Sequence, residues 1–214
     1  MTKTQFLPII VTAAVLALAG CKILPTPHKG DGEGGASFNA DKMAEEMWSA
    51  KVIPYLEQKA GPFLEVNALA KTDPAAAGAK YGNPKKQSAS PWTYAARVEG
   101  KIVASNTASR NGTVDVDVDG DAKPDVRVQI GPTIPGTALR DTLDFVNFND
   151  FTNQIDFAQF GKALNKLVDK TALSKLPRED LEGRTAKALG AYVLKGGSDL
   201  PVLTPAQAEI GPKP

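Results

Sequence analysis

Apolar and polar residues alternate in two short runs within residues 114–130, and this is the clearest strand signal in the chain. A period of two places the apolar side chains on one face of a strand, and the Asp119–Gly120 step is typical of a hairpin turn. The pattern predicts a β-hairpin with one β-branched face and one charged face, on which Arg127 pairs across the strands. The apolar positions are Val114, Val116, Val118, Val126, Val128 and Ile130.

Further strands are predicted on both sides of this hairpin. Residues 92–99 and 101–107 have strand character and are joined through Gly100, which is either a link between two strands or a bend in one long curved strand. Two last strands are expected over residues 184–194 and 202–210.

A helical pattern precedes the strands. Asn39 is a candidate N-cap for a helix that Pro54 breaks or restarts and that Gly61–Pro62 ends. Two shorter helices are expected over residues 64–71 and 74–80. The apolar face of the first helix is formed by Met43, Met47, Trp48, Ile53, Tyr55 and Leu56.

A longer helix is predicted over residues 150–169, between the hairpin and the last strands. The order of a bent strand, a hairpin, a helix and a second hairpin matches the five-stranded, partly open barrel of OB-folds, with its helix between the third and fourth strands. We therefore predict an α+β fold in which helices of residues 38–82 pack on a small OB-like barrel of residues 92–210. In the long helix, the side chains expected to face inward are Ile155, Ala158, Leu164 and either Leu167 or Val168.

The start of the chain has the pattern of an export signal. One charge, Lys3, precedes the apolar run Phe6–Ala19, which is too short for a comfortable membrane span. The run ends in Leu18–Ala19–Gly20–Cys21, which resembles the lipobox of bacterial lipoproteins, where signal peptidase II cuts before a cysteine whose sulfur carries a diacylglycerol. Two acyl chains give stable anchoring. We predict a signal peptide over residues 1–20 and a lipidated Cys21 that anchors the protein to the periplasmic face of a membrane.

Residues 21–37 are rich in glycine and proline and are predicted to form a flexible tether, followed by one globular domain over residues 38–214. The chain has 25 Lys and Arg against 24 Asp and Glu, and removal of Lys3 with the signal peptide leaves 24 of each. A nucleic-acid-binding surface needs a basic excess or a basic stripe, and the sequence has neither. Nucleic acid is therefore not an expected partner.

Four aspartates at the predicted hairpin tip are a candidate calcium site. They occupy positions one, three, five and nine of a loop, an arrangement that surrounds Ca²⁺ with carboxylate oxygens. The bidentate glutamate and the turn glycine of an EF-hand are missing, so the alternative is an acidic hairpin tip whose aspartates face water. The four residues are Asp117, Asp119, Asp121 and Asp125.

Arg140 and Asp141 end a loop rich in glycine and proline and are the candidate binding site for a ligand or partner. A planar guanidinium beside a carboxylate holds a polyol or an anion by several directed hydrogen bonds. Thr137, Asn153 and Gln154 join this site if the loop folds against the start of the helix. In the alternative interpretation, Arg140 and Asp141 only brace the loop.

Residues 131–141, 148–155 and 163–165, together with Trp48 and residues 190–192, resemble the signature of a family of predicted periplasmic lipoproteins of unknown function. The resemblance implies an OB-like fold. Members of this family are often encoded beside ABC importers for ribose and similar monosaccharides, which implies an accessory role in sugar uptake. The resemblance supplies no catalytic residues.

Enzyme motifs are absent from the sequence, which has no G-x-S-x-G, no H-E-x-x-H, no phosphate loop and a single histidine, His28. Apart from calcium, no cofactor is expected. The predicted function is that of a non-enzymatic, lipid-anchored accessory protein linked to a sugar ABC importer. One alternative is a binding module for a small sugar or oligosaccharide on a face of the barrel, and the other is a hydrolase that depends on paired carboxylates.

Overall fold

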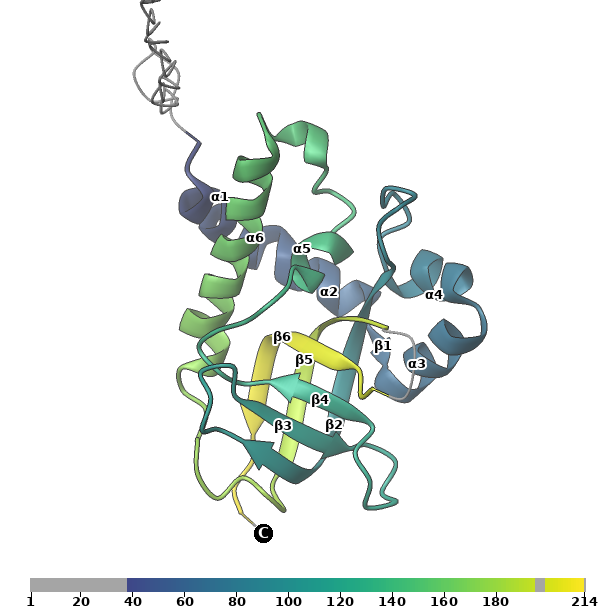
Figure 1. The fold of residues 1–214 in the computed structure, drawn as a ribbon, viewed down its shortest axis with the longest axis vertical. Coiled ribbons are helices and arrows are strands. Elements are labelled where there is room, and N and C mark those ends of the chain that lie inside the picture. Colours follow the sequence, from purple (N-terminus) through teal and green to yellow (C-terminus); the bar gives the residue numbers. More distant parts are fainter. Residues whose placement is uncertain (1–37, 195–198, 214) are drawn as a thin grey trace, which may run out of the picture. The chain divides into compact units, whose positions relative to one another are not determined.

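Five strands close into a barrel in the computed structural model, which describes residues 38–194 and 199–213 (Figure 1). The strand order is β2-β3-β4-β6-β5, and β5 pairs back onto β2. Neighbouring strands are antiparallel except β4 and β6, which are parallel. The two-residue β1 (Gly61–Pro62) pairs in parallel with β2. The barrel strands are β2 (Thr93–Asn106), β3 (Thr113–Asp117), β4 (Val126–Gln129), β5 (Thr185–Val193) and β6 (Val202–Ile210).

Helices lie outside the barrel, and the longest of them, α6 (Gln154–Val168), connects the third barrel strand β4 to the fourth, β5 (Figure 1). This placement confirms the predicted α+β fold with an OB-like barrel. Among the described residues, no helix has the length and apolar character needed to cross a membrane. The remaining helices are α1 (Ala40–Met47), α2 (Ile53–Lys59), α3 (Phe63–Thr72), α4 (Pro74–Tyr81) and α5 (Ala138–Thr142), with a 3₁₀ turn over Phe148–Asp150.

The strand β2 runs without a break through Gly100, so the interpretation as one long curved strand is correct. Its first part pairs with β5 and its last part with β3. A Cβ atom on Gly100 would lie 2.1 Å from the carbonyl oxygen of Asp117, so glycine is needed where the strand passes this close to its neighbour. Because of this bend, β2 pairs with β5 along one part of its length and with β3 along the other, which closes the barrel.

The predicted hairpin is present as β3 and β4, and its apolar side chains point into the barrel. Val116 and Val126 are fully buried. On the charged face, Arg127 donates from Nε and Nη2 to the carboxylate of Asp115 at 2.6 and 2.7 Å. The cross-strand pairing of Arg127 is therefore confirmed.

The connection between β3 and β4 is longer than predicted. β3 ends at Asp117, so Val118 lies in the loop and not in the strand, and residues 118–125, which include the Asp119–Gly120 step, join β3 to β4. The boundary differs because the Asp117 carboxylate accepts hydrogen bonds from the loop N–H groups of Gly120 and Ala122, which turns the chain at this point.

The predicted N-terminal helices are present with nearly the expected bounds. Asn39 caps α1, and its Oδ1 accepts a hydrogen bond from the backbone N–H of Lys42 at 2.9 Å. A π-helical turn over Trp48–Val52 joins α1 to α2. Pro54 restarts the helix, because it lies in the first turn of α2, where a missing N–H donor costs little.

The helix α6 begins later than predicted. Asn153 is its N-cap, and its Oδ1 accepts from the backbone N–H groups of Ile155 and Asp156 at 2.8 and 2.9 Å. The 3₁₀ turn over Phe148–Asp150 precedes this cap, with Phe151 as the C-cap of the turn. Residues 150–153 are therefore not part of the helix.

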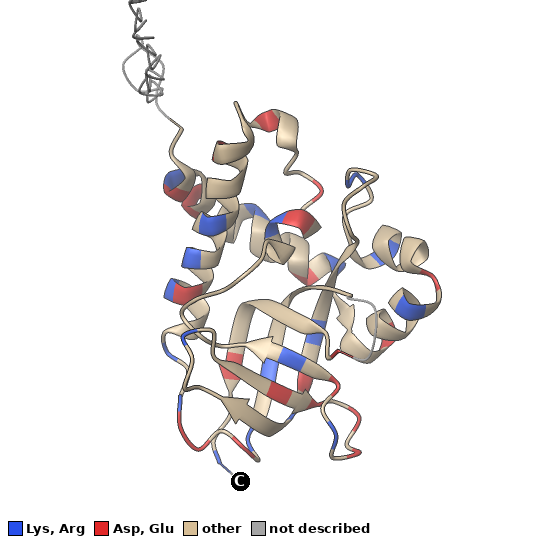
Figure 2. Cartoon of the chain, in the orientation of Figure 1, with Lys and Arg blue, Asp and Glu red and all other residues tan. Residues whose placement is uncertain are grey.

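The buried stripe of α6 lies on its later turns. Leu164 and both Leu167 and Val168 are buried as predicted, but Ile155 is 67 % exposed and Ala158 is also exposed, so their inward placement is wrong. The physical reason is the position of α1, which is joined to α6 by the ion pairs Asp41–Lys166 and Glu45–Lys170 (Figure 2). These contacts cover the C-terminal half of α6 and leave its first turn in solvent.

Candidate functional site

A cavity of about 490 Å³ lies where the segment before β2, the end of α5 and the start of α6 meet. Residues 83–91, 140–148 and 154–158 contribute its walls, and we call it the Arg140 cavity. Asn83 joins two of these segments, because its amide donates to the carbonyl of Leu143 at 3.2 Å while its Oδ1 accepts from the N–H of Lys85 at 2.8 Å. The cavity is therefore built from parts of the chain that are distant in sequence.

The Arg140 side chain is held at the wall of this cavity by four contacts. Its Nε and Nη2 donate to Oδ1 of Asp141 at 2.8 and 2.7 Å, and its Nη1 donates to the carbonyl of Phe157 at 3.3 Å. The guanidinium also lies over the Phe157 ring, 3.7 Å from the ring centroid. Only 11 % of the side chain is exposed. The planar group is thus fixed in position before any ligand binds.

The partners of Arg140 are fixed in turn. Thr137 donates its hydroxyl to Oδ2 of Asp141 at 2.6 Å, so both oxygens of this carboxylate accept hydrogen bonds. Gly161 on α6 lies against the guanidinium, and a Cβ there would make an ordinary van der Waals contact, 3.4 Å from Nη1 of Arg140.

Tyr55 anchors the short helix that carries Arg140 and Asp141. Its hydroxyl donates to the carbonyl of Thr142, the last residue of α5, at 3.2 Å. Burial, with a further contribution from the carboxylate of Asp144, raises the pKa of Tyr55 to about 12. The phenol therefore stays protonated as a donor at neutral pH.

The structure brings four of the five residues predicted for this site together, and the fifth lies apart from them. Arg140, Asp141 and Thr137 form one hydrogen-bonded group, and Gln154 lines the cavity beside the first two. Asn153 caps α6 instead and does not line the cavity. The loop thus folds against the start of the helix, which was the condition for these residues to meet.

Two lysines and two aromatic rings of the cavity were not predicted from the sequence. Lys86 stabilises the loop in which it lies, because its ammonium donates to the carbonyl of Ser90 at 2.8 Å and lies over the Trp92 ring. Lys85 is exposed, and its ammonium makes no hydrogen bond or ion pair within residues 38–194 and 199–213. Phe148 and Phe157 meet edge to face at 5.6 Å and form an apolar wall.

The acidic loop brings together three of its four predicted residues. Single carboxylate oxygens of Asp117, Asp119 and Asp125 lie within 4.8 Å of one another, whereas Asp121 is not part of this group. Asp117 is only 5 % exposed, and Asp125 accepts from the N–H of Val118 at 2.7 Å. The aspartates therefore do not all face water, and two of them build the loop itself. A hydrogen bond from the backbone of the loop lowers the pKa of Asp121.

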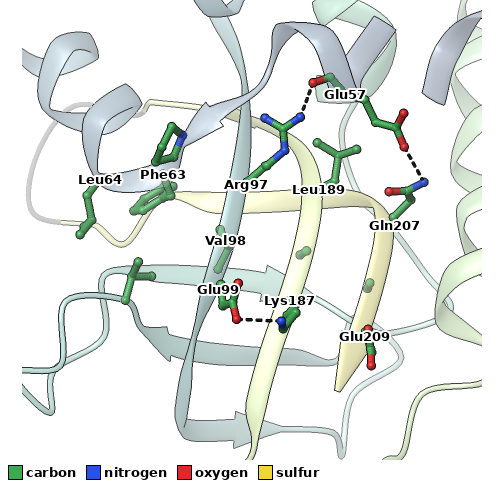
Figure 3. A pocket seen from close by; sticks show the side chains of 14 residues that line it. Glu57, Phe63, Leu64, Arg97, Val98, Glu99, Lys187, Leu189, Gln207 and Glu209 are labelled. Carbon is green, nitrogen blue, oxygen red and sulfur yellow. Dashed lines mark hydrogen bonds and ion pairs between the residues drawn. The ribbon is translucent and has the colours of Figure 1, made fainter. Parts of the chain in front are cut away.

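A second, larger hollow of about 840 Å³ lies on the outer face of the barrel, beside α2, β1 and α3 (Figure 3). We call it the barrel groove. Glu99 on β2 pairs with Lys187 on β5 at 2.8 Å, and Gln207 on β6 donates to Glu57 at 3.4 Å. Arg97 donates to backbone carbonyls at the end of α2. The sequence signal for this groove is the set of outward positions on β2, β5 and β6, which becomes visible only when the strands are paired.

Closure of five strands with a helix between the third and fourth defines the chain as an OB-fold protein. A solved structure described as an OB-fold protein from Thermotoga maritima is similar, with a TM-score of 0.64 and 20 % identity, over 82 % of this chain and 100 % of that one. This likeness concerns the fold. The chain belongs to the family described as predicted periplasmic lipoproteins, DUF2291, whose model matches residues 11–209. No curated protein matches the chain significantly.

Family membership establishes the setting of the protein, which is exported and lipid-anchored on the periplasmic side. The predicted signal peptide and tether lie outside the described residues, as does Cys21. Lipidation at Cys21 stays a prediction that rests on the lipobox sequence.

Proposed function

We propose that this lipoprotein is a non-enzymatic accessory component of a sugar ABC importer and that the Arg140 cavity holds the sugar during its transfer. The observation that carries the proposal is the fixed Arg140–Asp141 pair at the wall of an open cavity, beside the Phe148–Phe157 wall. Directed polar groups next to aromatic faces suit a ring that is hydroxylated at its edge and apolar on its faces. The cavity volume is in the range of small-molecule sites.

The state of the charged groups supports a binding role over catalysis. Asp141 accepts from Arg140 and from Thr137, so its oxygens are engaged with a cation and a hydroxyl rather than with a second carboxylate. A carboxylate-pair hydrolase needs an acid and a base that face the same bond across the substrate. The hydrogen bonds of the Arg140–Asp141 pair therefore support a role in ligand binding rather than in hydrolysis.

The barrel groove favours a second candidate, a binding module for an extended oligosaccharide. The groove is larger than the Arg140 cavity, and polar side chains of three adjacent strands line it beside Leu64 and Phe63 (Figure 3). OB-folds bind oligosaccharides on a sheet face. The Glu99–Lys187 ion pair of the groove is more exposed than the Arg140–Asp141 pair, and screening by water weakens it as a fixed recognition element.

The test compares two matched arginine substitutions. Arg140→Lys keeps the charge but loses the planar donor set, and Arg127→Lys makes the same change in an Arg–Asp pair on the outer face of the barrel. We expect ribose uptake by cells that carry Arg140→Lys to fall while Arg127→Lys cells keep parental uptake, with both purified proteins melting within a few degrees of the parent. Normal uptake with Arg140→Lys and a lowered melting temperature would show that Arg140 only braces the loop.

A further inference from the structure

Exposed apolar side chains gather at one end of the domain. Within the described part of the chain, the large hydrophobic residues that are exposed are Leu64 at 38 %, Phe148 at 36 % and Ile155 at 67 %. Two of them lie in the 3₁₀ turn and the first turn of α6. Ala158 is exposed one helical turn after Ile155, so the apolar surface continues along this face of the helix. We call Phe148, Ile155 and Ala158 the apolar end.

The chain enters the domain at this same end. Phe38, the first described residue, packs edge to face against Phe151 with ring centroids 5.6 Å apart. Phe151 contacts Phe157 at 5.2 Å, and Phe157 contacts Phe148 of the apolar end at 5.6 Å. A continuous set of aromatic contacts therefore links the entry point of the chain to the exposed apolar surface.

The length of chain before Phe38 limits how far this end lies from the membrane. Residues 22–37 separate Cys21 from Phe38, and a glycine-rich segment of that length has a root-mean-square span of about 20–25 Å. A globular unit of the length of this domain is about 40 Å across. With Cys21 as the lipid anchor, the end that carries Phe38 is thus held nearer to the bilayer than the opposite end.

We propose that the apolar end rests on the surface of the bilayer, so that the domain is oriented by its own side chains as well as tethered by its lipid. Phe148 and Ala158 also line the Arg140 cavity, so this orientation brings the rim of that cavity to the membrane surface. The inference rests on exposure and connectivity and does not depend on the proposed sugar transfer.

Charges of both signs border the apolar end. Asp150 is exposed and accepts from the N–H of Asn147 at 3.0 Å, and Asp156 accepts from the amide of Asn153 at 3.1 Å. Lys85 is exposed and lines the Arg140 cavity together with Phe148 and Ala158. The carboxylates repel anionic headgroups and the lysine attracts them, so the contact rests on the apolar side chains and forms on zwitterionic lipid.

The experiment uses the full, processed lipoprotein in vesicles. Cys21 is the only cysteine of the chain, and lipidation blocks its sulfur, so Ile155→Cys introduces a single thiol for an environment-sensitive fluorophore. Mass spectrometry confirms one label per protein. Leu64→Cys is the matched control, because Leu64 is also an exposed apolar residue on a helix but lies on α3, at the barrel groove.

We expect nitroxide-labelled zwitterionic lipids to quench the fluorophore at position 155 several-fold more than the one at position 64. Phe148→Cys, labelled in the same way, should behave like Ile155→Cys. Equal quenching at positions 155 and 64, or none at 155, overturns the proposal. The apolar end would then be a contact surface for a protein partner. Ribose and the importer are absent from this assay, so its outcome is independent of the uptake test.

Discussion

A charge placed inside the barrel tests the facing of the β3–β4 hairpin. Val116 is fully buried, and its β-strand neighbour Asp115 points outward to Arg127. In Val116→Asp, about 1.5–3 kcal/mol of apolar burial is lost. The new carboxylate adds a cost of about 2 kcal/mol or more, because Val116 lies within a cluster of buried apolar residues. The sum of about 4 kcal/mol is a large share of the roughly 5–15 kcal/mol that stabilises a typical domain.

The adjacent substitution Asp115→Val provides the comparison. It removes a surface ion pair worth at most about 1 kcal/mol, and it places a β-branched residue in a strand. With a urea m-value of about 2 kcal/mol per M, we expect the unfolding midpoint of Val116→Asp to fall by about 2 M and that of Asp115→Val to change by less than about 0.5 M. Tryptophan fluorescence and circular dichroism report the transition. Comparable midpoints for the two variants would show that the faces are assigned incorrectly.

Four further predictions follow from single features. Cys21→Ser should abolish processing and lipidation, and a variant that still enters the detergent phase in phase partitioning would contradict the lipobox assignment. Calcium should bind the acidic loop with a Kd of about 10⁻⁴ to 10⁻³ M if at all, because Asp117 and Asp125 already accept backbone hydrogen bonds; micromolar affinity by calorimetry, lost in Asp119→Ala, would refute this. Asn153→Ala should lower stability by about 1 kcal/mol through loss of the α6 cap, measured by denaturation, and an unchanged midpoint would argue against the cap. Gly100→Ala should destabilise the barrel by more than 1 kcal/mol, since the methyl group would collide with the Asp117 carbonyl, and a neutral effect would show that β2 bends elsewhere.

Local periodicity was sufficient to predict most elements of this fold. The valine–aspartate alternation identifies the hairpin, and the Asn39 cap identifies the first helix, because both signals arise from the covalent geometry of the chain itself. The order of the elements then restricts the topology to an OB-like barrel. The facing of Ile155 could not be predicted in this way, because α6 carries apolar residues on more than one side and the docking of α1 selects which side is buried.

The candidate site was predicted only where its residues are close in sequence. Arg140 and Asp141 are adjacent, and Thr137 lies one turn earlier, so their grouping follows from local geometry. Asn83 reaches the carbonyl of Leu143 across 60 positions, and no local pattern indicates this contact. The burial of Asp117 was missed for a different reason. The aspartates of the loop are chemically equivalent in the sequence, and the direction of the loop N–H groups decides which one is enclosed.

Binding of a small sugar in the Arg140 cavity can be measured by titrating the isotope-labelled protein with ribose and following its amide resonances. We expect saturable shifts in residues 83–91, 140–148 and 154–158, and we expect Arg140→Lys to weaken these shifts while Arg127→Lys preserves them. Shifts confined to residues of the barrel groove, such as Glu99 and Lys187, or no shifts at any ribose concentration, would contradict this expectation.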